Sequence, residues 1–344
     1  MGTERRFILL VLCAFVLLAA LAATTHGAAR DSISVAAIET ARHTAAPDVG
    51  APSTVGAPID ALTIERNVLA PLWATNLLER STLVPAAHAP IIGNKQIISY
   101  YGNPYTPDMG VLGSGDLETV ASELEAQAAR YDQLNGDMAV IPAIHLVYAV
   151  AQYHPTANGL FLQYVGDDDV RRYLDLTERH GMLLFLDLQI GKSSVAAEIR
   201  KAMPYLRYPQ VHLAIDPEFA VSGSEVPGAD LGSLHADDID EAQALLQQLV
   251  EKNALPPKVL IVHQFADSML QDPEGIRSYA NVQLIIDMDG FGPAAIKRAT
   301  YEQLAAQPYA ASAGIKLFFQ HDPDMMSEED VLRLQPTPNL VIYQ

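Results

Sequence analysis

The chain has 344 residues, of which 49% are hydrophobic, and this composition is sufficient to bury a large core. The formal net charge is −19, and because residues 1–30 hold three Arg and one Glu, residues 31–344 carry −21. That charge argues against nucleic acid or an anionic membrane surface as the partner. Cys13 is the only cysteine, so the chain beyond it has no disulfide, thiolate nucleophile or cysteine metal ligand.

Residues 1–29 have the three-part pattern of an export signal. Arg5 and Arg6 precede an uninterrupted apolar run from Phe7 to Ala23, and small residues follow up to Ala29. Such a segment is either removed after export or kept as a membrane anchor. We therefore expect a secreted protein, or one anchored to the outer face of the cytoplasmic membrane through this segment alone.

Residues 30–94 are rich in Ala, Pro and Thr and show no sustained period, which indicates a low-complexity linker. Within them, the stretch 62–84 is more apolar and contains Trp73, the only tryptophan. We interpret this stretch as a strap that packs on the domain that follows. Core anchoring is the more typical role for such a Trp than stacking on a ligand.

From residue 95 onward, short apolar runs alternate with amphipathic segments. Strands are expected at 96–102, 138–148, 181–189, 211–219, 258–265, 282–289, 314–321 and 339–344. Helical segments are expected at 116–134, 167–180, 193–205, 237–253, 273–278, 292–306 and 327–334. Eight strands separated by helices over about 250 residues predict a closed (β/α)₈ TIM barrel at 95–344. No GxGxxG or GxxxxGK[ST] motif follows any strand, which weakens nucleotide-binding alternatives.

Acidic residues stand at the expected carboxyl ends of three strands, where barrels of this kind carry their chemistry. Asp187 with Gln189, Asp216 with Glu218, and Asp287 with Asp289 are each spaced i, i+2, so both members of a pair leave one face of the strand. The apolar residues between them are expected to face the helices. One such acid commonly caps the next helix, but five on three strands predict a shared site at the barrel mouth.

Crowded carboxyl groups raise one another's pKa values, so that one is protonated while another is ionised, as glycoside hydrolysis requires. We predict Glu218 as the general acid/base and Asp289 as the nucleophile or base. Asp216 and Asp187 are expected to be deeper partners that tune Glu218. The side chains predicted to contact the substrate are Asp187, Gln189, His263, Asp287, Gln320, Tyr100, Tyr101 and Gln344, with Tyr105 and Tyr148 as further stacking candidates.

Asp216-Pro217-Glu218 on the fourth strand resembles the D-x-E of secreted glycoside hydrolase family 25 lysozymes, whose fold is similar to an α/β barrel of this kind. The resemblance covers that strand end alone, because Ser99-Tyr100-Tyr101-Gly102 stands where the family has an Asp on its first strand. It implies hydrolysis of a polysaccharide or glycan. More broadly, the stretches SYYGNP, LAIDPEF and DGFGP resemble exported bacterial barrel proteins of unsettled function, which implies no reaction.

Two other functions stay open. A metal-dependent hydrolase or lyase would use carboxylate and imidazole ligands, and a divalent metal is possible here. The candidate ligands are Asp187, Asp216, Glu218, His263, Asp289 and His321. No HxH or HExxH pair occurs, so we assign no metal ligand and no cofactor from the sequence; His145 and His212, within strands, are expected to be core or lining residues. The third function is a non-catalytic barrel that binds carbohydrate or cell wall. Serine acyl transfer is disfavoured because no GxSxG elbow is present.

Overall fold

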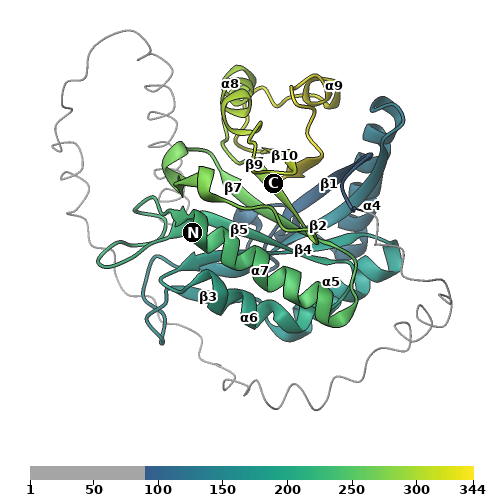
Figure 1. Ribbon diagram of the computed structural model, residues 1–344. Coiled ribbons are helices and arrows are strands. Elements are labelled where there is room, and N and C mark those ends of the chain that lie inside the picture. The colour runs from purple at the N-terminus through teal and green to yellow at the C-terminus, as the bar shows by residue number, and fades with distance from the viewer. Residues whose placement is uncertain (1–89) are drawn as a thin grey trace, which may run out of the picture. The chain divides into compact units, whose positions relative to one another are not determined.

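Eight parallel strands form a closed sheet in the computed structural model, which describes residues 90–344 (Figure 1). The expected export signal and strap, and the linker up to residue 89, lie outside the described residues. The barrel strands are β1 Lys95–Gly102, β2 Ala139–Ala151, β4 Leu183–Gly191, β5 Val211–Ala220, β7 Lys258–Gln264, β9 Val282–Met288, β10 Ser312–Leu317 and β11 Leu340–Tyr343. Because β1 pairs in parallel with both β2 and β11, the sheet closes on itself. The predicted (β/α)₈ barrel is therefore confirmed.

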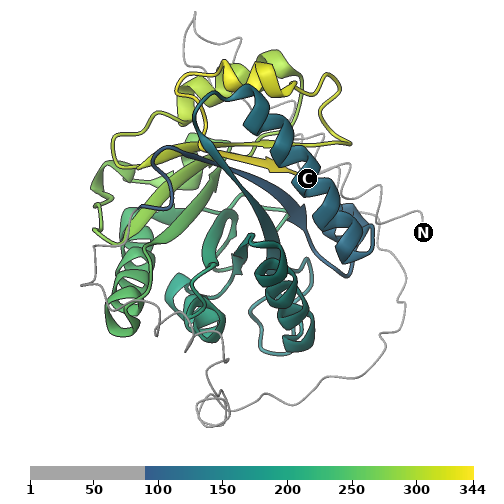
Figure 2. The same ribbon diagram turned by 90° about the vertical axis from the view of Figure 1, so that its right-hand side faces the viewer.

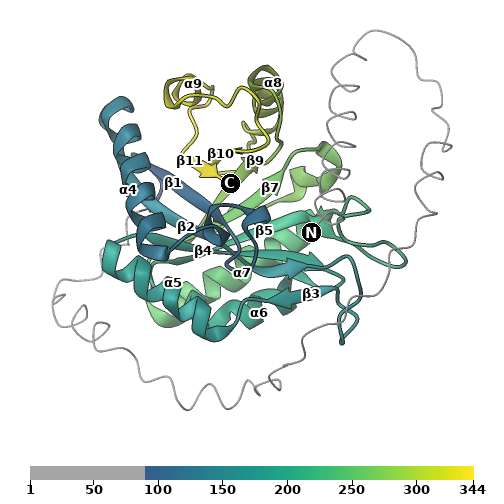
Figure 3. The ribbon, with the colours of Figure 1, turned by 180° about the vertical axis from the view of Figure 1, so that it is seen from behind.

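Helices cover the outside of this barrel, as the view turned by 90° shows (Figure 2). The α-helices are α4 Leu117–Leu134, α5 Asp167–His180, α6 Val195–Leu206, α7 Ala236–Asn253, α8 Ala294–Leu304 and α9 Glu328–Leu332. Seen from behind, α4 runs beside β1 and β2, and the chain ends next to β1 (Figure 3). Among residues 90–344, none of the helices combines the length and apolar character needed to cross a bilayer.

Helix α5 illustrates how local sequence sets these elements. Three Asp occupy its first turn, and Arg179 and His180 occupy its last, so both ends complement the helix dipole. Gly181 then adopts φ 64°, a left-handed conformation in which glycine avoids the steric cost of a β-carbon, and the helix stops there. The predicted range 167–180 is confirmed at both ends.

One connection departs from the regular βα pattern. Between β7 and β9 the chain forms the 3₁₀ helices η5 Asp267–Met269 and η6 Pro273–Gly275 and the short strand β8 Leu270–Gln271, but no α-helix. Strand β8 pairs with β6 Leu234–His235, which directly precedes α7. The expected helical segment at 273–278 is thus a single 3₁₀ turn, because Gly275 has a low helix propensity and the backbone is extended at Ile276.

The barrel has two apolar layers. The outer layer lies between sheet and helices and includes Leu186, Leu188 and Ile215, as predicted. The inner layer fills the barrel with Ile97, Ala143, Phe185, Ala214, Val259, Ile261, Ile285, Leu340 and Ile342, among others. Toward the carboxyl ends of the strands, the inward positions change from apolar to charged, which positions the candidate site.

Candidate active site

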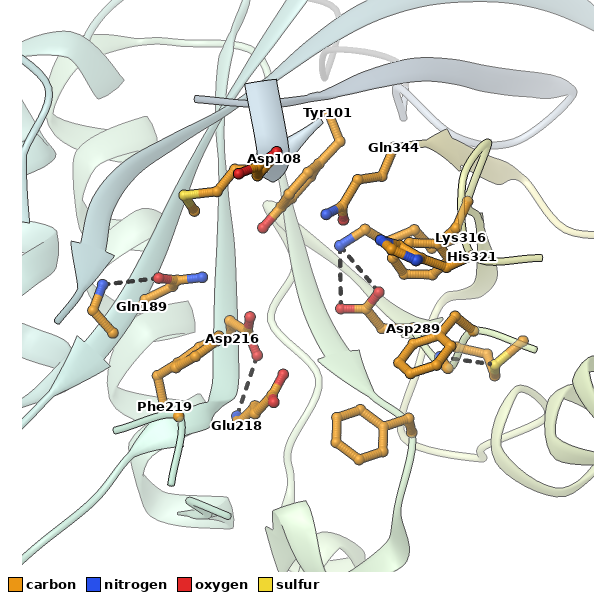
Figure 4. A pocket seen from close by; sticks show the side chains of 18 of the residues that line it. Tyr101, Asp108, Gln189, Asp216, Glu218, Phe219, Asp289, Lys316, His321 and Gln344 are labelled. Atoms are coloured by element: carbon orange, nitrogen blue, oxygen red, sulfur yellow. Dashed lines mark hydrogen bonds and ion pairs between the residues drawn. The ribbon is translucent and has the colours of Figure 1, made fainter. Parts of the chain in front are cut away.

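A cavity of about 360 Å³ lies at the carboxyl ends of the barrel strands (Figure 4). Its charged walls include Asp216 and Glu218 on β5, Asp289 directly after β9, and Lys316 on β10. Aromatic rings supply much of the remaining surface, namely those of Tyr101, Phe219, Phe265, Phe291 and Phe318. Apolar walls with a few converging polar groups are typical of small-molecule and glycan sites.

Asp216 and Glu218 form one side of the cavity, and the pKa of each is raised. The backbone N–H of Glu218 donates to Asp216 Oδ1 at 3.2 Å, which ties the two residues together. Burial, reinforced by the charges of Asp187 and Asp289, raises the pKa of Asp216 to about 7. Burial and the nearby carboxylates of Asp216 and Asp289 hold the pKa of Glu218 well above its usual 4.5. Glu218 therefore holds its proton more strongly than an exposed glutamic acid does.

Asp289 faces this pair from the other side of the cavity, where it forms an ion pair with Lys316 (Figure 4). Lys316 Nζ lies 3.0 Å from Asp289 Oδ1 and 3.3 Å from Oδ2. The same ammonium lies 3.6 Å from the centre of the Tyr101 ring, a cation–π contact. The site therefore places a carboxyl group paired with a lysine opposite one whose pKa is raised by burial.

Four fully buried polar side chains lie among the barrel strands but do not line the cavity; we call them the buried cluster: His145, Asp187, His263 and Asp287. His263 Nδ1 donates to Asp287 Oδ2 at 3.0 Å, and its Nε2 lies 3.5 Å from Asp187 Oδ2. Burial alone would lower the pKa of His263, but Asp187 and Asp289 outweigh it and hold the pKa well above 6.5.

The other members of the buried cluster respond to burial in different ways. Burial would raise the pKa of Asp187, but the imidazoles of His263 and His145 outweigh it and keep the pKa below its ordinary value. Burial raises the pKa of Asp287 and lowers that of His145 to about 4. Room for Asp287 depends on Gly314, because a Cβ there would lie 2.7 Å from Asp287 Oδ1.

Six of the residues predicted for the site line the cavity: Tyr101, Gln189, Asp216, Glu218, Asp289 and Gln344. Gln189 Oε1 accepts from the backbone N–H of Ala151 at 2.8 Å, which fixes its amide. Three more, Asp187, His263 and Asp287, point into the barrel as expected but belong to the buried cluster. A substrate in the cavity would therefore not touch these three without displacing other groups.

Tyr100 and Gln320 are not where the sequence prediction placed them. Tyr100 lies in the outer layer, with its hydroxyl 3.5 Å from the Glu123 carbonyl on α4, because alternation turns Tyr101 inward and its neighbour outward. Gln320 is exposed in a turn, since β10 ends at Leu317 rather than at residue 321. His321 lines the cavity instead. Of the further tyrosines, Tyr148 also belongs to the outer layer and Tyr105 is exposed.

Two buried lysines at the site were missed by the sequence reasoning. Lys316 is described above; Lys297 on α8 donates to the carbonyl oxygens of Gly290 and Lys316 and forms an ion pair with Asp322 at 3.1 Å. A signal for Lys316 existed, because GIKLFFQH places a lysine within an apolar strand, on the face opposite Ile315 and Leu317.

No protein-family model and no curated protein matches the sequence. Similar solved structures include a cellulose synthase subunit Z from Clostridioides difficile, at 10% identity and TM-score 0.35 over 57% of this chain and 61% of that one. A second is a proposed alpha-L-fucosidase from Bacteroides thetaiotaomicron, at 9% identity and TM-score 0.37 over 77% of this chain and 91% of that one. A third is a hyperthermophilic endo-beta-1,4-glucanase, at 9% identity and TM-score 0.32 over 71% of this chain and 88% of that one. The chain thus spans about three-fifths of the first of these proteins. At such values the similarity carries no argument about function, and the barrel is established by its own strand pairing.

Proposed function

We propose that the protein hydrolyses glycosidic bonds in a polysaccharide or glycan, with Glu218 as the general acid. One observation carries the proposal: Glu218, whose pKa burial raises well above 4.5, faces the ion-paired side chain of Asp289 across one cavity (Figure 4). Glycoside hydrolysis needs this combination, because the leaving oxygen requires a proton while the anomeric carbon develops positive charge.

In the proposed reaction, Glu218 gives its proton to the glycosidic oxygen as the bond to the anomeric carbon breaks. The carboxylate of Asp289 then either bonds to that carbon or takes a proton from the attacking water. In the first case, the ionised Glu218 takes a proton from a water molecule, and that water then hydrolyses the glycosyl ester. Lys316 positions Asp289 for either role through their ion pair.

The walls of the cavity support a sugar ring as the ligand. Rings such as those of Tyr101, Phe219 and Phe291 offer apolar faces for the C–H side of a pyranose, whereas Gln189 and Gln344 offer amides to its hydroxyls. The net charge of −19 favours a neutral or cationic glycan over an anionic one. A substrate outside the cytoplasm is part of the proposal, in line with the export signal expected at residues 1–29.

The test is a hydrolysis screen of the full-length chain on cell-wall and extracellular polysaccharides, with Glu218→Gln as the diagnostic variant. The amide keeps the size of the side chain but has no proton to transfer, so kcat should fall by about 10²–10⁴-fold. Glu274→Gln is the matched control, because Glu274 is exposed in η6 outside the cavity, and its kcat should equal that of the wild type.

Other outcomes of the screen separate the remaining functions. Hydrolysis that survives unchanged in Glu218→Gln contradicts the proposal. Glycan binding without hydrolysis in both the wild type and the variant favours a non-catalytic binding barrel. Hydrolysis that persists in Glu218→Gln but stops on addition of a chelator favours a metal-dependent enzyme.

A further inference from the structure

We propose that the buried cluster binds one first-row transition metal ion, of which Zn²⁺ is the best representative, through His145, Asp187 and His263. These residues come from β2, β4 and β7, and each offers a ligand atom within 4.8 Å of the other two. The inference concerns an ion held inside the barrel and does not rest on the proposed glycosidase activity.

The distances in the cluster fit coordination better than hydrogen bonding. Asp187 Oδ2 lies 3.6 Å from His145 Nε2 and 3.5 Å from His263 Nε2. Hydrogen bonds from a ring N–H to an oxygen span about 2.7–3.2 Å, so both contacts are too long. Two atoms bound to one tetrahedral Zn²⁺ at about 2.1 Å lie about 3.4 Å apart, close to the separations found here.

The same atoms lack hydrogen-bond partners among the described residues. Both ring nitrogens of His145, both carboxylate oxygens of Asp187 and Nε2 of His263 are buried without one. A buried polar group left unsatisfied costs about 1–3 kcal/mol, and more when it is charged. Such groups require an explanation. One cation in contact with His145 Nε2, Asp187 Oδ2 and His263 Nε2 would give three of these unsatisfied atoms a partner at once.

Asp287 completes the arrangement as a positioning residue for His263. Its Oδ2 accepts from His263 Nδ1 at 3.0 Å, which directs the other ring nitrogen, Nε2, toward Asp187. Metal-bound histidines are held in this way by a carboxylate on the nitrogen that does not bind the ion. Binding would release the proton from Nε2 of His263 and leave its lone pair for the metal.

The ligand set also selects the class of ion. Two imidazoles and one carboxylate suit Zn²⁺ and its first-row neighbours, whereas Ca²⁺ and Mg²⁺ prefer sites built from oxygen alone. Three protein ligands would leave a fourth position for water, and three is the usual number of protein ligands in zinc sites that keep an open position.

The experiment is an isothermal titration of the chelator-treated, full-length chain with ZnCl₂, together with elemental analysis of the protein after dialysis. The wild type should bind one Zn²⁺ per chain. His145→Ala and Asp187→Asn each remove a ligand and should weaken binding by at least about 100-fold, and Asp287→Asn by about 10–100-fold. His154→Ala is the control, because His154 is exposed in the loop after β2, outside both the cluster and the cavity, and it should bind as the wild type does.

Two outcomes would overturn the inference. Folded wild-type protein that takes up no Zn²⁺ contradicts it directly, and so does unchanged affinity in folded His145→Ala, which would place the ion elsewhere. If the variants do not fold, crystals of the wild type soaked in ZnCl₂ decide. An anomalous peak about 2.0–2.2 Å from the three ligand atoms supports the site, and a water molecule with no anomalous signal refutes it.

Discussion

Lys258 and Lys316 are both buried in the barrel but lie toward opposite ends of its strands. Lys258, the first residue of β7, donates from Nζ to the backbone carbonyl oxygens of Tyr208 and Val211 at 2.8 Å and of Pro209 at 3.4 Å. Burial lowers its pKa to about 7. Lys316, near the end of β10, instead contacts the carboxylate of Asp289 in the cavity wall.

The difference shows how the barrel separates stability from chemistry. At the amino end, the partners of Lys258 Nζ are three backbone carbonyl oxygens, and none of them is a side chain. At the carboxyl end, Lys316 is instead paired with the side chain of Asp289, which lines the cavity. The amino end of such a barrel is accordingly expected to govern folding, and the carboxyl end ligand binding and catalysis.

The largest effect on stability should follow from Lys258→Met. The variant removes two short hydrogen bonds from a charged donor, to the carbonyl oxygens of Tyr208 and Val211, at about 1.5–3 kcal/mol each, so the free energy of unfolding should fall by about 3–6 kcal/mol. Urea denaturation measures this loss. The kcat of the folded fraction should stay at the wild-type value, and a lowered kcat would show that the two ends are not separable.

The second effect concerns pH and Asp216. Its folded pKa of about 7 lies above the ordinary 3.8, so its contribution to stability is complete below about pH 4 and is lost as the pH rises through 7. The loss should be on the order of 3–4 kcal/mol by pH 8. Asp216→Asn cannot ionise and should abolish this part of the pH dependence in urea denaturation. If the free energies of unfolding of the wild type and Asp216→Asn change with pH in the same way, the raised pKa of Asp216 is contradicted.

The third effect is catalytic and comes from Lys316→Met. Without the ammonium, Asp289 loses the partner that holds it in place, so kcat/KM on a substrate found in the screen should fall by about 100-fold. Lys252→Met, on the exposed end of α7, is the matched control and should leave kcat/KM unchanged. Equal kcat/KM values for the two variants would show that Lys316 has no role in the reaction.

The smallest effect is expected for Tyr101→Phe. The ring remains beneath Lys316 Nζ, so the cation–π contact is kept, and the free energy of unfolding should change by less than about 1 kcal/mol. Thermal denaturation of Tyr101→Phe beside Tyr100→Phe checks this. A much larger loss in Tyr101→Phe would mean that its hydroxyl, rather than its ring, supports the site.

Strand alternation explains which parts of the site could be predicted from the sequence. Leu186 and Leu188 had to face the helices, and this turned Asp187 and Gln189 inward. The same rule applied to β1 would have turned Tyr100 outward. The prediction for Tyr100 was wrong because it relied on nearness to the strand end rather than on alternation.

The depth of a side chain and its partners across strands could not be predicted in this way. Whether Asp187 lines the cavity or lies below it depends on the stagger of the strands around the barrel, which no single strand encodes. The pairing of Lys316 with Asp289 depends on the register between β9 and β10, in which Gly314 lies beside Asp287. The ends of strands were also poorly defined by composition, and Gln320 was misplaced for that reason.

The central claim is that the barrel mouth raises the pKa of Glu218 well above its usual 4.5, which suits it to donate a proton. Its most direct test is a titration of the Glu218 carboxyl carbon by ¹³C NMR, with Glu218→Gln used to assign the signal. The account predicts a midpoint well above 4.5, because burial and the charges of Asp216 and Asp289 oppose ionisation. A midpoint at or below 4.5 would contradict it, since Glu218 would then have no proton to donate at neutral pH.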